Sequence, residues 1–115
     1  MDQLLPLAQR IGEKLKSRKE TIGISESSAG GLVSAVLLAA EHVRERLKTT
    51  WGLAETGAAG PTGNSYGDPA GHTCVAVVGP KGKIARTLRT GSSDRVANMR
   101  AFAAEALKLF DEQLS

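Results

Sequence analysis

Apolar residues recur along the chain at two different spacings, and each spacing predicts one kind of element. Residues 2–18 (DQLLPLAQRIGEKLKSR) predict an amphipathic helix, because their apolar positions follow helical spacing at Leu4, Leu7, Ile11 and Leu15. Residues 20–27 (ETIGISES) form a short β-branched run, which is typical of a strand. Residues 91–114 begin with Ser and Asp, which cap helices, and continue with apolar residues at helical spacing. They predict a last helix.

The middle of the chain predicts three further strands. Residues 51–57 (WGLAETG) predict a strand, and a loop rich in Gly, Pro, Asn and Asp follows it. Residues 72–80 (HTCVAVVGP) and 83–90 (KIARTLRT) are separated by Lys-Gly, which predicts a β-hairpin. The order helix, strand, helix, strand, hairpin, helix predicts an α/β protein whose sheet is covered by helices.

The segment between the first two strands changes character abruptly at residues 40 and 41. Residues 32–40 (LVSAVLLAA) are apolar on every side, as in a buried helix. Residues 41–50 (EHVRERLKTT) are mostly charged. Two interpretations are open: one helix that leaves the core, or a junction between two helices that once lay apart.

Composition narrows the class of protein. A chain of 115 residues is the size of one domain, and with 3% aromatic residues its core must consist mainly of Ala, Val, Leu and Ile. The net charge of +3 is mild, and no run of Lys and Arg is interleaved with aromatic residues, so we expect no nucleic-acid face.

The single cysteine and the apolar runs bear on the cellular environment. Cys74 lies in an apolar strand, which is typical of a small core residue, and it excludes an internal disulfide. We find no signal peptide and no apolar run of about 18 residues. These features predict a soluble cytoplasmic protein with no membrane partner.

Three turns carry the candidate chemistry, namely ESSAGG, ETGAAGPTG and GSSDR. Ligands of open α/β sheets bind beyond the carboxyl ends of the strands, where the first two turns are expected. Glycines and helix N-termini present backbone N–H groups to phosphate, and the guanidinium of Arg95 adds a phosphate-binding group. The alternative is that the glycines serve only tight connections and that Arg95 is a surface residue.

A nucleophilic serine in the first turn requires a base. The two histidines, His42 and His72, have no acidic residue at a spacing that indicates a triad, so we interpret both as structural. Two histidines and one cysteine scattered along the chain predict no zinc site. Glu26 and Glu55 each precede a candidate turn, and they are either a pair of carboxylates at its mouth or solvated strand ends.

Four segments together resemble the C-terminal domain of the competence/damage-inducible protein CinA, namely ESSAGGL, ETGAAGPTG, GDPAGHTCVAVVGP and TGSSDRVANMR. That family includes nicotinamide mononucleotide (NMN) deamidases. The resemblance implies a three-layer α/β/α sandwich. It also implies hydrolysis of the NMN carboxamide to nicotinate mononucleotide and ammonia, without a cofactor or metal.

The family turn Glu-Ser-Cys-Thr-Gly-Gly assigns roles by resemblance. Its nucleophilic serine falls on Ser27, and Thr56 falls in the family's second turn as a ligand hydrogen-bonding residue, so these two form the catalytic set. Backbone N–H groups of the two turns hold the oxyanion or phosphate, and the family arginine is a phosphate contact. The substrate-binding set implied in this way is Ser28, Gly30, Gly31, Gly57, Gly60 and Arg95.

One family motif, Tyr-x-Asn-x-x-Lys, is absent, and its lysine is the base for the serine. We interpret residues 38–41 as a deletion junction within a single domain of residues 1–115. The deletion removes a central strand with its flanking helices, which leaves a gap or new edges in the sheet. New edges favour a homo-oligomer. The sequence leaves open whether Lys48 or His72 replaces the lost base.

Three hypotheses follow from the resemblance and the missing motif. The chain is an NMN deamidase-like domain of reduced activity, because a missing general base costs about 10² to 10⁴ in rate. Alternatively, it is a nucleotide-binding or regulatory protein without catalysis. The third hypothesis is a truncated gene product with no stable fold.

Overall fold

The predicted order of elements is confirmed in a computed structural model, which describes residues 4–27, 33–64 and 67–115. The elements are α1 (Leu4–Arg18), β1 (Ile22–Ser27), α2 (Val33–Leu47), β2 (Trp51–Ala58), β3 (His72–Gly79), β4 (Gly82–Arg89) and α3 (Arg95–Leu114). Helix α3 begins at an N-cap, Asp94, whose carboxylate accepts a hydrogen bond from the backbone N–H of Ala97. The Ser/Asp signal before the last helix therefore marks its start correctly.

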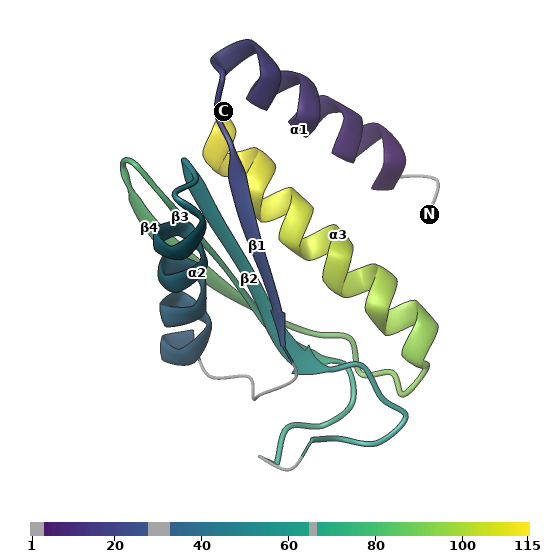
Figure 1. Cartoon of the computed structure of the whole chain (residues 1–115). Helices are drawn as coiled ribbons and strands as arrows, with labels where there is room; N and C mark the ends of the chain where they lie inside the picture. Colours follow the sequence, from purple (N-terminus) through teal and green to yellow (C-terminus); the bar gives the residue numbers. More distant parts are fainter. Residues whose placement is uncertain (1–3, 28–32, 65–66) are drawn as a thin grey trace.

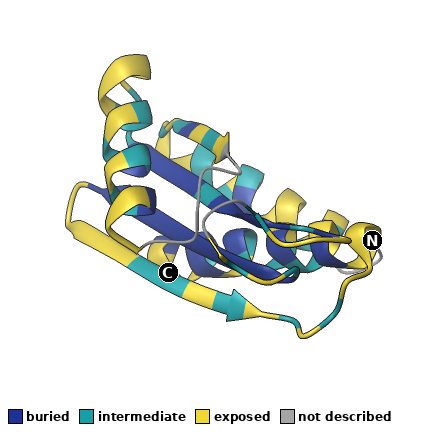
Figure 2. Cartoon of the chain, turned by 90° about the horizontal axis from the view of Figure 1, so that it is seen from below, coloured by how far each residue is buried: buried dark blue, intermediate teal, exposed yellow. Residues whose placement is uncertain are grey.

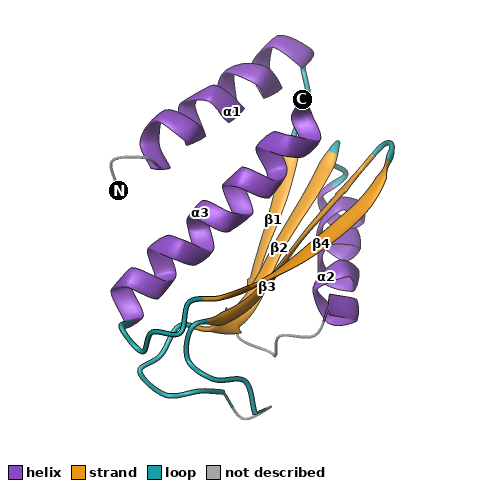
Figure 3. Ribbon diagram, turned by 180° about the vertical axis from the view of Figure 1, so that it is seen from behind, coloured by secondary structure: helices purple, strands orange, loops and turns teal. Residues whose placement is uncertain are grey.

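The four strands form one sheet in the order β1-β2-β3-β4, with β1 parallel to β2 and the other neighbours antiparallel. Helix α2 covers one face, and α3 lies across the other with α1 beside it (Figure 1; Figure 3). The three-layer α/β/α class is confirmed. The four described strands pair in unbroken order, so no gap separates them.

Helix α2 is continuous through residues 40 and 41, which agrees with both interpretations of that segment. The expectation that residues 32–40 are buried on every side is wrong. Val36 and Ala40 are fully buried against the sheet, whereas Leu38 is 65% exposed and Val33 is 46% exposed. A helix that lies on one sheet buries one stripe, and no described element covers the outer side of α2.

Buried residues are concentrated on the inner strands of the sheet (Figure 2), and their side chains form two clusters, one on each face. The cluster under α2 consists of small residues: Val36, Ala40, Ala54, Cys74, Ala76 and Val78. The cluster under α1 and α3 is larger, and in it the rings of Trp51 and Phe110 meet edge to face at a centroid distance of 5.4 Å. Cys74 is a buried core residue, as expected. None of the helices that the structure describes has the length and apolar character needed to cross a bilayer.

Candidate functional site

The candidate turns after β2 and before α3 meet at the end of the sheet where β1, β2 and β4 finish. Strand β4 runs antiparallel to β3 and therefore in the same direction as β1 and β2, so the carboxyl ends of all three strands lie at this end of the sheet (Figure 1). The guanidinium of Arg95 donates a hydrogen bond of 2.8 Å to the carbonyl oxygen of Gly60. The turn before α3 thus lies against the turn after β2. This was expected if β4, the strand before the third turn, ran parallel to β1 and β2.

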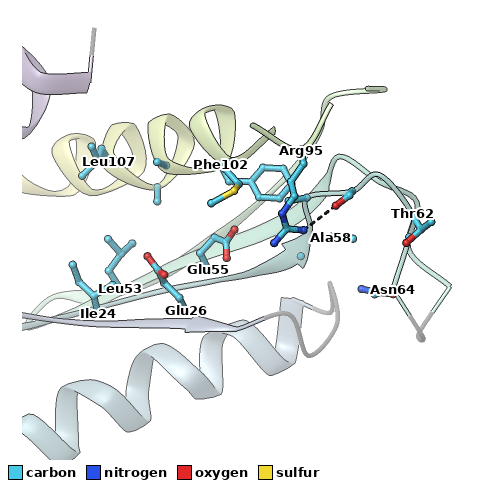
Figure 4. Close-up of a pocket in the computed structure, with 17 residues that line it drawn as sticks. Ile24, Glu26, Leu53, Glu55, Ala58, Thr62, Asn64, Arg95, Phe102 and Leu107 are labelled. Atoms are coloured by element: carbon cyan, nitrogen blue, oxygen red, sulfur yellow. Dashed lines mark hydrogen bonds between the residues drawn. The ribbon is translucent and has the colours of Figure 1, made fainter. Parts of the chain in front are cut away.

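A cavity of about 780 Å³ lies between this end of the sheet and α3 (Figure 4). Strands β1 and β2 supply its floor, with Ile24, Glu26, Leu53 and Glu55. Helix α3 supplies a wall that includes Met99, Phe102, Ala103, Ala106 and Leu107, and the mouth is formed by residues 57–60, residues 62–64 and Arg95. Among the described elements the backbone of α3 lies close to β2, β3 and β4 but not to β1, which leaves the β1 side of the floor open.

Two glycines of the predicted binding set line the cavity, and packing also requires them. A Cβ atom at Gly57 would lie 2.3 Å from the carbonyl oxygen of His72. Gly60 has a φ of 106°, which favours glycine, and a Cβ there would lie 2.8 Å from the carbonyl oxygen of Ser93. Both glycines therefore have a structural role, in addition to placing bare backbone at the cavity mouth.

A buried asparagine holds the two loops together, and sequence reasoning missed it. Asn98 is 1% exposed, and its amide donates hydrogen bonds of 2.8 Å to the carbonyl oxygens of Ala59 and Ser92. Its own oxygen accepts a hydrogen bond from the hydroxyl of Thr90. The available signal was an asparagine four residues before the buried Phe102, on the inward stripe of the helix.

Glu26 and Glu55 are directly opposite each other in the register of β1 and β2, and both side chains lie on the cavity floor (Figure 4). Burial raises the pKa of Glu55 above its ordinary value, a hydrogen bond with Thr73 opposes the increase, and the charge of Glu26 adds to it. The structure places these residues as a pair of carboxylates that line the cavity, with Glu26 exposed to solvent and Glu55 partly buried.

The remaining predicted residues are not gathered in this cavity. Thr56 is 5% exposed and follows Glu55 in β2, so its side chain lies on the opposite face of the sheet, under α2. Ser27 is the last residue of β1, in register with Thr56, and its side chain lies outside the description. The other three members of the set, Ser28, Gly30 and Gly31, lie outside the described residues.

Neither side chain considered as a replacement base lies in the cavity. Lys48 follows the last residue of α2. It lies at the end of the sheet where β2 begins, opposite the end that holds the cavity mouth. His72 is buried, its Nδ1 accepts a hydrogen bond of 3.1 Å from Arg89, and its Nε2 lies 3.6 Å from the carboxylate of Asp68. These contacts agree with a structural role for His72. Across residues 4–27, 33–64 and 67–115, no three His, Cys, Asp or Glu side chains gather closely enough to hold a metal ion.

Comparison with known sequences identifies the family. A family model described as the CinA C-terminal domain matches residues 36–114. A CinA-like protein of Desulfosudis oleivorans is 25% identical over 158 residues, covering 98% of this chain and 38% of the relative. One from an Anaeromyxobacter species is 44% identical over 71 residues, covering 61% of this chain and 17% of the relative. The chain therefore spans well under half the length of these curated relatives.

Comparison with solved structures shows the same fold. A competence-damaged protein (CinA) superfamily protein from Klebsiella pneumoniae matches with a TM-score of 0.80 at 18% identity, covering 96% of this chain and 97% of that one. A competence/damage-inducible protein from Agrobacterium tumefaciens matches with a TM-score of 0.79 at 19% identity, covering 95% and 94%. Because the family model matches most of the sequence and these structures share its fold, the chain belongs to the CinA C-terminal domain family.

Proposed function

We propose that this chain is a cytoplasmic pyridine-nucleotide-binding member of its family, which binds NMN in the cavity and has lost efficient deamidase activity. One observation carries the proposal: Arg95 and the carboxylates of Glu26 and Glu55 line the same cavity (Figure 4). NMN carries a negative phosphate and a positive pyridinium ring. The guanidinium fits the phosphate, and the carboxylates fit the ring.

The dimensions and the walls of the cavity also support a mononucleotide. Its volume lies within the range of small-molecule sites, about 300 to 1,000 Å³. Ile24, Leu53 and Phe102 supply apolar surface for a flat ring. Arg95 uses one nitrogen to hold Gly60 and retains other N–H groups for a phosphate.

The lack of a base supports weak catalysis. The chain has no Tyr-x-Asn-x-x-Lys motif, and none of the described residues that line the cavity is a lysine or a histidine. We infer that the motif was lost at residues 38–41 of this single domain. The alignment with the Desulfosudis protein supports a loss, because it spans 158 residues and the chain has 115, so that relative carries residues without a counterpart here.

Isothermal titration calorimetry with NMN tests binding. We expect saturable binding that Arg95→Ala weakens by about tenfold or more, since a charged hydrogen-bonding group is lost. Arg100→Ala is the matched control, because Arg100 is exposed on the same helix and is a described residue outside the cavity lining. Nicotinamide riboside, which lacks the phosphate, should bind the wild type as weakly as NMN binds the Arg95 variant.

A parallel assay of ammonia release separates the hypotheses. We expect little or no release from NMN by the wild type. Rapid release that disappears in Ser27→Ala would contradict the loss of deamidase activity while leaving binding intact. Absence of saturable NMN binding by a chain that melts cooperatively would contradict the proposal as a whole, and a non-cooperative melt would favour a truncated gene product.

A further inference from the structure

The two edges of the sheet differ in how they are protected from another strand. Strand β4 carries three cations, Lys83, Arg86 and Arg89. Lys83 pairs with Glu41 at 2.7 Å, and Arg86 pairs with Glu105 at 2.7 Å and with Glu112. Charged side chains along an edge strand disfavour pairing with a further strand, because pairing would remove them from water.

Strand β1 has none of these features. Its residues, Ile22–Ser27, include one charged side chain, Glu26, and no lysine, arginine or proline. Ile24 lies in the middle of the strand with 56% of its surface exposed. Of the two helices on that face, neither brings its backbone close to β1 among the described residues, although Ile22 at the start of the strand packs against the core beneath them. The β1 edge is therefore open around the exposed Ile24, and it carries no positively charged side chain.

We propose that the β1 edge binds a second copy of this chain, with the two β1 strands antiparallel about a two-fold axis at Ile24. An isologous contact requires a self-complementary surface, and a strand paired with itself in antiparallel fashion meets this requirement. With the axis normal to the sheet, side chains of even-numbered residues stay on the cavity face in both copies. Ile24 then lies opposite the partner copy's Ile24, and the apolar surface of each is buried.

The charges of the strand are compatible with this register, because it keeps the two Glu26 carboxylates apart. With the axis at Ile24, Glu26 lies opposite Ile22 of the second copy, and the two Glu26 carboxylates are at opposite ends of the paired strands. A shift of two residues toward the amino end would instead place Glu26 opposite Glu20, and like charges in that position are destabilising.

Pairing at this edge also extends the cavity. Ile24 and Glu26 stand on the edge strand and line the cavity, so a strand added to β1 continues its floor. Without a second copy, the floor ends at the exposed side chain of Ile24. The four strands of each copy become one continuous sheet, with both cavities on the same face.

Sedimentation velocity over a series of protein concentrations tests the proposal. Wild type should form a dimer as concentration rises, and Ile24→Lys should remain a monomer. Ile84→Lys is the matched control. Ile84 lies on β4, at the opposite end of the row across the sheet that consists of Ile24, Leu53, Val77 and Ile84, and 40% of its surface is exposed. This control should dimerise like the wild type, and circular dichroism should show that both variants are folded.

Hydrogen exchange on the wild type tests the same contact without a substitution. Amides of residues 22–26 should become more protected as concentration rises, while those of β4 should not change. A wild type that stays monomeric over the whole series would overturn the proposal. Equal loss of the dimer in the two lysine variants, or concentration-dependent protection of β4 instead of β1, would also overturn it.

Discussion

The two faces of the sheet are packed in different ways. Under α2 the contact is close and made of small residues: a Cβ atom at Gly52 would lie 2.1 Å from the carbonyl oxygen of Ala40. Under α3 the side chains are larger, and Phe110, Leu109 and Leu114 gather with Trp51 at the end of the sheet where β2 begins. Among the described residues, the second face has a large cavity at the carboxyl ends of the strands, and the first has none there.

The order of residue sizes along α3 explains this difference. Its last two turns present Phe110 and Leu114 to the sheet, whereas the part of the helix that faces the cavity includes the small residues Ala103 and Ala106. Large side chains hold the helix away from the strands, and the two alanines leave part of the intervening space unfilled. The site is therefore a consequence of uneven packing on one face, and the close packing of the opposite face keeps the floor of the site in place.

The largest expected effect is that of Phe110→Ala, which removes the aromatic contact on the α3 face. Phe110 is fully buried and packs edge to face against Trp51. Truncation of a buried phenylalanine costs about 3 to 5 kcal/mol of unfolding free energy. Urea unfolding followed by circular dichroism measures the loss. Val96→Ala, on an exposed position of the same helix, should change the free energy by no more than about 0.5 kcal/mol.

A smaller loss is expected from Gly52→Ala on the α2 face. The added methyl group would meet the carbonyl oxygen of Ala40 and, at 2.9 Å, the Cβ atom of Arg44, so α2 must move away from the sheet. Overpacking of this kind costs about 1 to 3 kcal/mol. Gly12→Ala in α1 is the control, since an added Cβ has no neighbour within 4 Å, and it should be stabilising. Equal melting temperatures for the two variants would refute close packing under α2.

Much of the fold followed from the sequence because each signal was local. The spacing of Leu7, Ile11 and Leu15 and the cap before Arg95 act within a few residues, and they predicted α1 and the start of α3 correctly. The burial of α2 was overestimated because composition alone does not tell how many layers cover a helix. Leu38 is apolar, yet it points away from the only sheet described beside it.

The candidate site was predictable only in part. Gly57, Gly60 and Arg95 were expected to lie together, and they do, because their turns follow strands that end at one edge. Thr56 was expected in the site as well, but it directly follows Glu55 in β2. Because side chains alternate along a strand, that of Thr56 lies on the opposite face of the sheet, under α2. The role of Asn98 depends on the carbonyl oxygens of two loops, and a contact that joins distant segments leaves little trace in a single sequence.

The smallest expected effect concerns Glu55 and depends on pH. Because burial raises its pKa in the folded protein, Glu55 retains its proton above the ordinary carboxyl value of 4.5, where the unfolded chain has already lost it. The folded state then binds more protons than the unfolded state, so wild-type stability falls as pH rises through this interval. Glu55→Gln stays neutral and avoids that loss.

The free energy of unfolding of Glu55→Gln, relative to that of the wild type, should therefore increase as the pH is raised from 4 to 8. Urea midpoints measured over this range test the change. Glu45→Gln, at an exposed position of α2, supplies the control for an amide substitution, and its difference from the wild type should change less with pH. Parallel pH profiles for wild type and Glu55→Gln would show that the cavity floor does not desolvate this carboxyl group. The α3 face would then be as open to water as the outer surface of α2. The two faces of the sheet would differ in the size and fit of their side chains but not in how far they desolvate a carboxyl group.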